Sequence, residues 1–202
     1  MTMVAEAHSQ TADPHSFPNY ITAEMNMDDQ MIAHMIQAVD NDPEEGVIAA
    51  SAEEEGRFTS DRALRRSQVF RVPAENEWIG VYQGFGQFIE QINAQVFNFN
   101  LEGIEALQIA RYQAGELGHY GWHTDSAYPN NRRKLSISVQ LSESEDYEGG
   151  DLEFMFRDPP VKASRQKRHA IVFPSYSVHR VTPVTKGARY SLVAWIRGER
   201  WR

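Results

Sequence analysis

The sequence contains no cysteine, which narrows the chemistry that its 202 residues can carry. Disulfide bonds, zinc–thiolate sites and cysteine nucleophiles are all excluded. A bound metal would therefore need histidine, aspartate or glutamate as its protein ligands. The sequence also lacks an apolar run of the 18 or more residues that a membrane span needs, and it lacks the basic and apolar segments of a signal peptide. We therefore expect a soluble, cytoplasmic protein with no membrane partner.

The composition indicates one folded domain preceded by a polar segment. Hydrophobic residues make up 41% of the chain and aromatic residues 11%, which is enough for one substantial core at this length. Residues 1–20 are polar, contain Pro14 and Pro18, and show no apolar period. We therefore predict a flexible tail over residues 1–20 and a single domain over residues 21–202.

Two stretches in the first half have the apolar spacing of helices. Apolar residues recur on one helical face from Met31 to Val39, behind a capping residue at or before Asp28. A longer, aromatic-rich stripe runs from about Glu75 to Phe97, and this period is typical of a helix face packed on a sheet. Between the two helices lies an acidic connection at residues 40–61, whose role the sequence leaves open.

The second half of the chain has the pattern of short strands separated by turns. Six apolar or alternating segments follow one another: ALQIARY, WHTD, KLSISVQLS, DLEFMF, AIVF and RYSLVAWI. Strands that follow two helices predict an α+β fold that is mainly β. In this fold the antiparallel strands form a sandwich or barrel, and the helices pack on one outer face.

A candidate metal site begins at His123 and Asp125, which lie two residues apart in an extended segment. Side chains at positions i and i+2 of a strand point to the same face, so the two groups can bind one ion. Such a pair is common on protein surfaces, and a third ligand is needed to support it. His179 follows an apolar strand 54 residues after Asp125. Two histidines and one carboxylate are the ligands that proteins use for non-haem Fe(II). His119 and His169 are interpreted as structural or surface histidines.

The order of these residues resembles the 2-oxoglutarate/Fe(II)-dependent dioxygenases. After His123, Asp125 and His179 comes Arg189, ten residues beyond the second histidine and followed by Tyr190 and Ser191. The segments EALQIARYQAGELGHYGWHTD and SVHRVTPVTKGAR are similar to the prolyl- and lysyl-hydroxylase-like branch, and the resemblance spans roughly residues 60–198. It implies a double-stranded β-helix, or jelly roll, with the N-terminal helices packed on one sheet.

The resemblance also implies a cofactor, two cosubstrates and a set of residue roles. His123, Asp125 and His179 would hold Fe(II), and 2-oxoglutarate and O2 would be the cosubstrates. Arg189 would hold the far carboxylate of 2-oxoglutarate, with Ser191 and Tyr112 as further contacts; an ordinary core tyrosine is the less favoured alternative for Tyr112. Family members that halogenate lack a carboxylate at the position of Asp125, so its presence favours hydroxylation. Three aromatic residues are expected to form walls of the pocket: Tyr120, Trp122 and Trp195.

The expected activity is hydroxylation of an unactivated C–H bond in a peptidyl (prolyl- or lysyl-type) or free amino acid substrate, with release of succinate and CO2. A cupin-like metal-binding jelly roll without oxygenase activity would fit the same three ligands but would have no use for Arg189. An oxygenase that acts on a siderophore-type small molecule or on nucleic acid would share the cofactor chemistry. The basic clusters at residues 132–134 and 165–168 favour solvated strand ends over a nucleic-acid site. Substrate, hydroxylated position and oligomeric state stay open.

Overall fold

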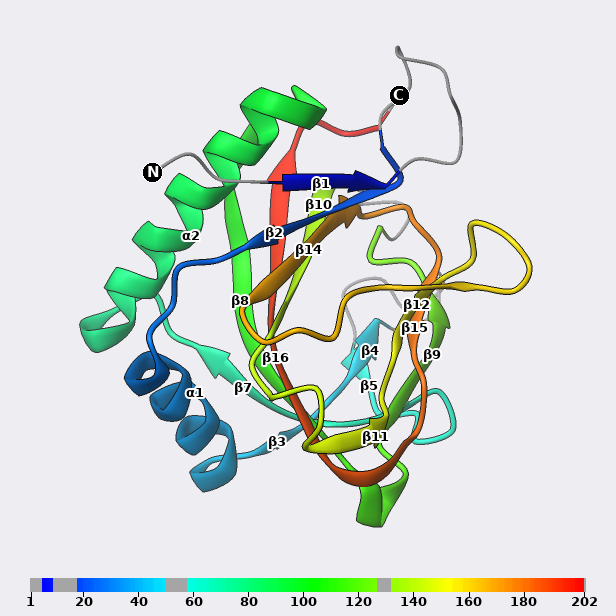
Figure 1. The fold of residues 1–202 in the computed structure, drawn as a ribbon. Coiled ribbons are helices and arrows are strands. Elements are labelled where there is room, and N and C mark those ends of the chain that lie inside the picture. The colour runs from blue at the N-terminus through cyan, green and yellow to red at the C-terminus, as the bar shows by residue number, and fades with distance from the viewer. Residues whose placement is uncertain (1–4, 9–17, 50–57, 127–131, 202) are drawn as a thin grey trace.

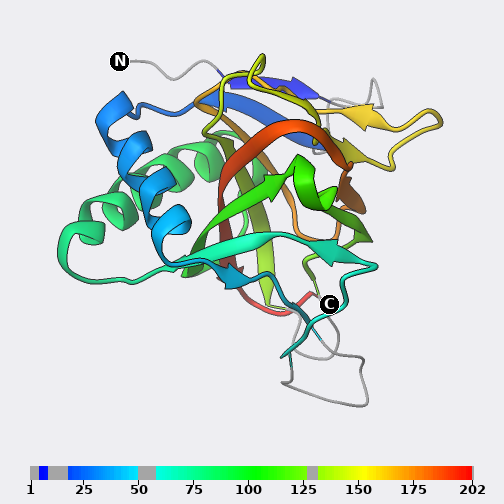
Figure 2. The ribbon, with the colours of Figure 1, turned by 90° about the horizontal axis from the view of Figure 1, so that it is seen from below.

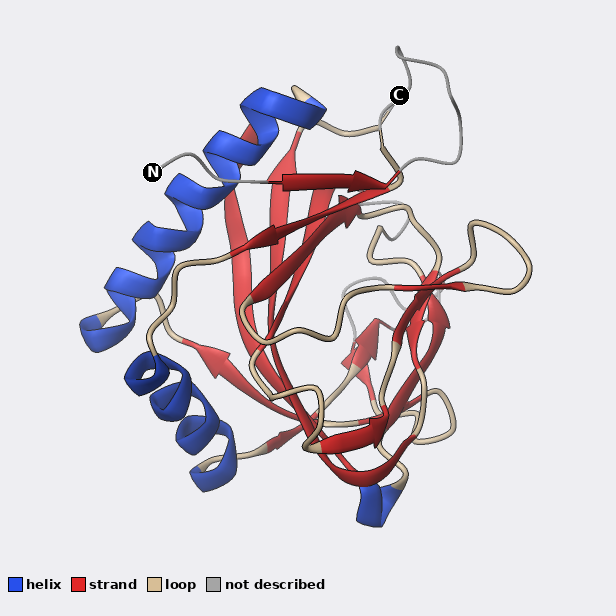
Figure 3. Cartoon of the chain, in the orientation of Figure 1, coloured by secondary structure: helices blue, strands red, loops and turns tan. Residues whose placement is uncertain are grey.

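Two antiparallel sheets face one another, and two helices cover the outer face of the larger sheet (Figures 1 and 3). The computed structural model describes residues 5–8, 18–49, 58–126 and 132–201. Figure 2 shows the same arrangement from below, with both helices on one side of the strands. The predicted mainly β, α+β architecture is confirmed.

The larger sheet contains nine strands, which run in the order β1-β2-β14-β10-β16-β8-β7-β3, with β11 pairing to β16. Its two longest strands, β8 and β16, pair with each other along most of their length. The strands of this sheet are β1 (Ala5–His8), β2 (Tyr20–Glu24), β3 (Glu44–Glu45), β7 (Gln68–Val72), β8 (Leu101–Gln113), β10 (Arg133–Gln140), β11 (Tyr147–Gly149), β14 (His169–Pro174) and β16 (Val184–Gly198).

The smaller sheet contains five short strands in the order β13-β12-β15-β9-β6. They are β6 (Arg65–Arg66), β9 (His119–His123), β12 (Leu152–Phe154), β13 (Val161–Lys162) and β15 (His179–Val181). A separate two-stranded sheet joins β4 (Ile48–Ala49) to β5 (Phe58–Thr59). Each of the six predicted strand segments overlaps a strand of one of the two main sheets.

Both predicted helices form. Helix α1 (Asp29–Asn41) begins after Asp28, whose side chain accepts a hydrogen bond from the backbone N–H of Met31. The second helical segment begins with a 3-10 turn (Asn76–Trp78), continues as α2 (Ile79–Ile92) and ends in a π-helical turn (Asn93–Phe97). No helix in the described parts of the chain is long and apolar enough to cross a membrane.

Two apolar clusters form the core, one on each face of the larger sheet. The first lies between the sheet and the helices and includes Phe85 of α2 and Ile137 of β10. The second lies between the two sheets and includes Tyr112 of β8 and Phe173 of β14. Because neighbouring residues of a strand point to opposite faces, strands β7, β8, β14 and β16 contribute to both clusters, whereas β10 contributes apolar residues to the first cluster alone.

Part of the predicted tail is a strand. Residues 5–8 form β1 and pair with β2 at the edge of the larger sheet. The ring of His8 stacks on Tyr20 at 4.4 Å between ring centroids, and its Nε2 lies 3.2 Å from Oγ1 of Thr22. The prediction of a flexible tail at residues 1–4 and 9–17 falls outside the described residues, as does the centre of the acidic connection at residues 50–57.

Candidate metal and cosubstrate site

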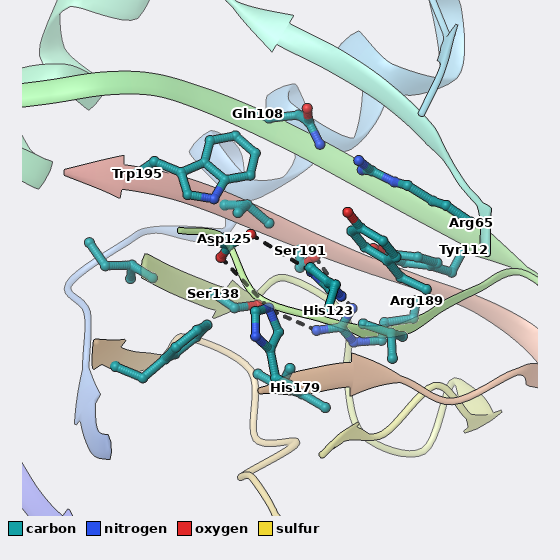
Figure 4. A pocket seen from close by; sticks show the side chains of 16 residues that line it. Arg65, Gln108, Tyr112, His123, Asp125, Ser138, His179, Arg189, Ser191 and Trp195 are labelled. Atoms are coloured by element: carbon teal, nitrogen blue, oxygen red, sulfur yellow. Dashed lines mark hydrogen bonds and ion pairs between the residues drawn. The ribbon is translucent and has the colours of Figure 1, made fainter. Parts of the chain in front are cut away.

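A pocket opens between the two sheets, and Figure 4 shows the side chains that line it. Its empty volume is about 460 Å³, part of which is continuous with solvent. The larger sheet lines it from β8, β10, β14 and β16, and the smaller sheet from β6, β9, β12 and β15. Every metal and cosubstrate residue predicted from the sequence lines this pocket: Tyr112, His123, Asp125, His179, Arg189 and Ser191.

The three candidate metal ligands meet at one end of the smaller sheet. His123 and His179 are direct cross-strand partners of β9 and β15. Asp125 follows β9, and its backbone N–H donates to the carbonyl of Ser175 at 3.0 Å. The Nε2 atoms of His123 and His179 lie 3.7 and 3.6 Å from the Asp125 carboxylate. All three donor atoms fall within 4.8 Å of one another, so one ion can contact all of them.

The hydrogen bonds of the two histidines leave their Nε2 lone pairs free for a metal. The Nδ1 atom of His123 lies 2.8 Å from the carbonyl of Gly121, and that of His179 lies 2.9 Å from the carbonyl of Ser177. A carbonyl only accepts, so both Nδ1 atoms carry the proton and both Nε2 atoms face the carboxylate without one. The two Nε2 atoms and the Asp125 carboxylate thus face one another with no hydrogen between them, and this arrangement favours a bound cation.

Electrostatics favour the same protonation states. Burial, together with the neighbouring His179, lowers the pKa of His123 to about 3, so its imidazole is neutral. Burial alone would raise the pKa of Asp125, but the neighbouring His179 and His123 bring it below its usual range. A neutral imidazole and an ionised carboxylate are the forms that bind Fe(II), so these residues fit the ion.

Arg189 is a buried cation on the larger sheet with no carboxylate beside it. Its side chain is 1% exposed, and no ion pair joins it to an acidic group among the described residues. Its guanidinium donates to Gln140 at 3.0 Å and makes longer contacts with Ser191 at 3.4 Å and Ser138 at 3.5 Å. The buried Nε has no hydrogen-bond partner within the described residues. A buried guanidinium without a counter-charge is costly, and binding an anion would offset that cost.

The structure brings Tyr112 and Ser191 to Arg189, as the sequence predicts. Tyr112 is the cross-strand partner of Arg189 in the β8–β16 pair, and the guanidinium carbon lies 5.5 Å from the centre of its ring. The Tyr112 hydroxyl makes no hydrogen bond within the described part of the chain. Ser191 lies two residues after Arg189 and points to the same face of β16. The pocket therefore has a metal-ligand end and a cationic end.

The sequence did not identify the polar residues of β10 as part of the site. Ser138 and Gln140 contact Arg189 from this strand, where they alternate with the apolar residues Ile137, Val139 and Leu141. Their alternation with apolar residues looks like that of a strand with one solvated face. Both faces of β10 are buried, however. The signal that could have identified them is that Ser138 and Gln140 share one strand face with Ser136, because polar residues on a buried face need partners.

The aromatic residues near the ligands have different positions. Tyr120 and Trp195 line the pocket, as predicted, and Tyr120 stacks on His123 at 3.5 Å between ring centroids. Burial raises the pKa of Tyr120 to about 12, so its hydroxyl keeps its proton. The buried Nε1 of Trp195 has no hydrogen-bond partner among the described residues. Trp122, which was also predicted as a wall, packs instead under the guanidinium of Arg180 at 4.4 Å.

The remaining candidate groups lie outside the pocket. The ring of His119 reaches the carbonyls of Leu117 and Ala63, and His169 contacts Ser164 at 2.8 Å. The cations of the two basic clusters have partners on the protein. Their partners are Glu102 for Arg132, Glu105 for Arg133, the ring of Trp201 for Lys134, Asp151 for Arg165, Asp29 and Glu143 for Lys167, and Asp29 for Arg168. These cations are therefore paired within the protein, and Lys134 is buried, so the interpretation as solvated strand ends does not hold for this residue.

Residues 107–197 match the model of the 2OG-Fe(II) oxygenase superfamily. The matched segment contains all six predicted site residues. A PKHD-type hydroxylase of Synechococcus sp. (strain CC9605) is 39% identical over 95 residues, covering 46% of this chain and 42% of the relative. A PKHD-type hydroxylase of Alteromonas mediterranea is 41% identical over 85 residues, covering 39% of this chain and 38% of the relative. The chain thus matches about two fifths of the length of these relatives.

Solved structures share the fold over most of the chain. A Pseudomonas putida prolyl-4-hydroxylase superposes with a TM-score of 0.69 at 19% identity, covering 90% of this chain and 93% of that one. A Trichoplax adhaerens prolyl hydroxylase, solved in complex with a hypoxia inducible factor peptide, has a TM-score of 0.70 at 17% identity, covering 89% and 84%. The predicted double-stranded β-helix with helices on one sheet is confirmed, and residues 107–197 are similar to the 2OG-Fe(II) oxygenase superfamily.

Proposed function

We propose that this protein is a 2-oxoglutarate- and Fe(II)-dependent dioxygenase that hydroxylates an unactivated C–H bond of a peptidyl or free amino acid substrate. The family uses Fe(II), 2-oxoglutarate and O2, and relatives similar to this chain carry the name hydroxylase. The peptide bound to the Trichoplax prolyl hydroxylase supports a substrate of peptide or amino acid type.

The observation that carries this proposal is the position of Arg189. A buried guanidinium without an acidic partner is costly to fold unless an anion binds to it. Arg189 lines the same pocket as the His123, Asp125 and His179 cluster, so one molecule can contact both ends. A dicarboxylate with a 2-oxo group at one end has the matching chemistry, because a guanidinium forms paired hydrogen bonds with a carboxylate.

Each residue of the pocket has a role in this proposal. His123, Asp125 and His179 hold Fe(II) and leave three of six octahedral positions open. When bound, the iron with 2-oxoglutarate and O2 supplies the oxidant for C–H hydroxylation, and succinate and CO2 are released. Arg189 and Ser191 hold the far carboxylate, and the Tyr112 hydroxyl can donate to it. Leu152, Phe173 and Val181 add apolar side chains to the pocket lining, which limits the access of water to the site.

The cupin-like alternative uses the metal ligands and has no role for the buried cation. A metal-binding jelly roll without oxygenase activity would need only His123, Asp125 and His179. Such a protein could hold a neutral side chain at position 189 without the cost of burying a charge. The affinity for 2-oxoglutarate therefore separates the two functions.

The test is a titration of anaerobic Fe(II)-loaded protein with 2-oxoglutarate, followed by the visible absorption band that chelation of iron by a 2-oxo acid produces. Arg189→Ala should keep the iron and lose cosubstrate affinity. An unpaired buried carboxylate costs on the order of 3 to 5 kcal/mol, which is roughly 10² to 10³-fold in affinity. Arg189→Lys should rescue binding only in part, because it keeps the charge and loses the paired geometry.

Arg197→Ala is a matched control, since it removes the same charge from the same strand. Arg197 is 45% exposed and pairs with Glu105, so cosubstrate affinity should not change. Succinate release over prolyl and lysyl peptides and free amino acids then tests the substrate class. The proposal is wrong if the wild-type protein gives no band, or if the Arg189→Ala variant binds 2-oxoglutarate as tightly as the wild type.

A further inference from the structure

A second buried arginine lines the same pocket. Arg65, in β6 of the smaller sheet, is 6% exposed and makes no ion pair with any acidic group of the described residues. It does not contact Arg189, and none of the metal and cosubstrate roles proposed above requires it. The pocket therefore contains two cations that lack a counter-charge among the described residues, one on each sheet.

Arg65 is held in a defined position by its neighbours. Its Nε donates to Ser67 at 2.8 Å, and its Nη1 donates to the carbonyl of Val47 at 2.8 Å. Gly46 packs directly against the Ser67 hydroxyl and the guanidinium: a Cβ atom at position 46 would clash first with Oγ of Ser67 and would lie 2.7 Å from Nε and 3.0 Å from the guanidinium carbon of Arg65. The Nη2 atom makes no hydrogen bond with the described residues. One face of the cation is fixed, and one nitrogen remains available to a ligand.

The free end of Arg65 lies close to the metal ligands. Its guanidinium carbon is 4.7 Å from the centre of the Tyr120 ring, and that ring stacks on His123. One aromatic ring therefore separates the cation from a candidate iron ligand. In Figure 4 the side chains of Arg65 and Gln108 point toward one another at the edge of the pocket. Gln108 adds an amide N–H that can donate to the same ligand.

We propose that Arg65 and Gln108 bind a carboxylate of the substrate, an inference that rests on the proposed function for its metal site. Arg189 already accounts for the far carboxylate of 2-oxoglutarate, so the second cation is available to the other substrate. Because Arg65 and His123 both contact the Tyr120 ring, a carboxylate bound to Arg65 would lie close to the metal ligands. This spacing fits a free amino acid, or the C-terminal residue of a peptide, better than a residue inside a peptide chain.

Paired probes test this inference. The probes are L-proline, L-lysine, glycyl-L-proline and glycyl-L-lysine, each compared with its own carboxamide, which has the same shape without the carboxylate charge. Binding to the anaerobic Fe(II)- and 2-oxoglutarate-loaded protein is measured by calorimetry, so the result does not depend on turnover. We expect at least one acid to bind about 10-fold or more tightly than its amide, because a guanidinium–carboxylate contact is strong when desolvated.

Variants of Arg65 should remove this preference. In Arg65→Met the acid and its amide should bind within about 2-fold of each other, whereas Arg65→Lys should keep part of the preference. Gly46→Ala should reduce it, because the new methyl group displaces the guanidinium. Arg66→Met is the matched control: Arg66 contacts the carbonyls of Arg62 and Glu116 away from the pocket, so the preference should remain.

The outcomes separate this inference from the proposed function. The inference is overturned if no acid binds more tightly than its amide, or if the preference persists in Arg65→Met. It is also overturned if Arg66→Met removes the preference as fully as Arg65→Met does, since net charge would then explain the effect. Iron and 2-oxoglutarate binding should be unchanged in all of these variants. Loss of the 2-oxoglutarate band in wild-type protein would instead overturn the proposed function.

Discussion

The two faces of the larger sheet are both buried, yet they differ in chemistry. In β10, Leu135, Ile137 and Val139 face the helices, and all three are fully buried in an apolar cluster. The residues that alternate with them, Ser136, Ser138 and Gln140, face the smaller sheet and are also buried. The same division occurs in β16, where Leu192, Ala194 and Ile196 face the helices and Arg189, Ser191 and Trp195 face the pocket.

This difference indicates that the helix face of the larger sheet contributes mainly to stability and that the pocket face contributes mainly to ligand binding. The helix face is mainly apolar, and its apolar side chains gain free energy from burial alone. Its polar groups Arg111 and Tyr190 have a partner, because both contact Asp40 of α1. The pocket face contains polar atoms whose hydrogen bonds are incomplete, namely the Nε of Arg189 and the Nε1 of Trp195. Buried polar groups without partners destabilise a fold, and they are retained where a ligand satisfies them. Substitutions on the two faces should therefore have separable effects.

The largest expected effect is at the metal ligands. His179→Ala removes one of three protein bonds to the ion, so iron affinity should fall on the order of 100-fold or more. The unfolding free energy of the metal-free protein should change by less than about 2 kcal/mol. Iron content after anaerobic reconstitution measures the first effect and urea denaturation the second. His119→Ala should bind iron normally, and undiminished binding by His179→Ala would remove that residue from the site.

The opposite result is expected on the helix face. Ile137→Ala leaves a cavity in the cluster beneath α2 and should lower the unfolding free energy by about 2 to 5 kcal/mol. Iron and 2-oxoglutarate affinities, measured on folded protein, should remain within about 2-fold of wild type. A substantial loss of cosubstrate affinity would show that the two faces are coupled through the strand.

Gln140→Met should have a smaller effect, confined mainly to the cosubstrate. Methionine has a similar shape but cannot accept the 3.0 Å hydrogen bond from Arg189. The guanidinium would be less well held, and the dissociation constant for 2-oxoglutarate should rise about 10-fold, or ~1.4 kcal/mol. The absorbance titration of Fe(II)-loaded protein measures this change. Tighter binding would mean that Gln140 competes with the cosubstrate for Arg189 instead of orienting the cation.

Ser138→Ala, next to Ile137 in β10, should have the smallest effect of the four. Its hydroxyl is 3.5 Å from Arg189, at the limit of a hydrogen bond. The unfolding free energy should change by less than about 1 kcal/mol and 2-oxoglutarate affinity by about 3-fold at most. Denaturation and titration of this variant beside Ile137→Ala compare the two faces at adjacent positions. A stability loss as large as that of Ile137→Ala would contradict the division between them.

The sequence predicted the features that depend on local patterns. The apolar period indicated both helices, and the predicted capping segment Asn26–Asp28 contains Asp28, the residue that caps α1. The i, i+2 spacing placed His123 and Asp125 on one face, and the order of the later residues led to His179 and Arg189. The structure brings these side chains into one pocket, although Asp125 lies just beyond the end of β9 and is placed there by the hydrogen bond from its backbone N–H to Ser175.

The features that the sequence did not predict depend on contacts between distant strands. The polar stripe of β10 could not be distinguished from a solvated face, because its burial depends on where the smaller sheet lies. Arg65 is one of two consecutive arginines, and only tertiary packing buries it while Arg66 remains partly exposed. The pairing of β1 with β2 brings residues from the predicted tail into the larger sheet through edge hydrogen bonds, which a polar composition does not reveal.

Because the site is divided between the two sheets, its ligands should restrict the motion of one sheet relative to the other. His123 and His179 belong to the smaller sheet, and Arg189 belongs to the larger one. Iron alone would therefore restrain only β9 and β15, whereas 2-oxoglutarate bound to both ends would tie the two sheets together. A ligand that binds only the closed arrangement slows local opening in proportion to its affinity. Amide hydrogen exchange should slow in β9 and β15 when iron is added, and separation of the sheets should become rare only when 2-oxoglutarate follows.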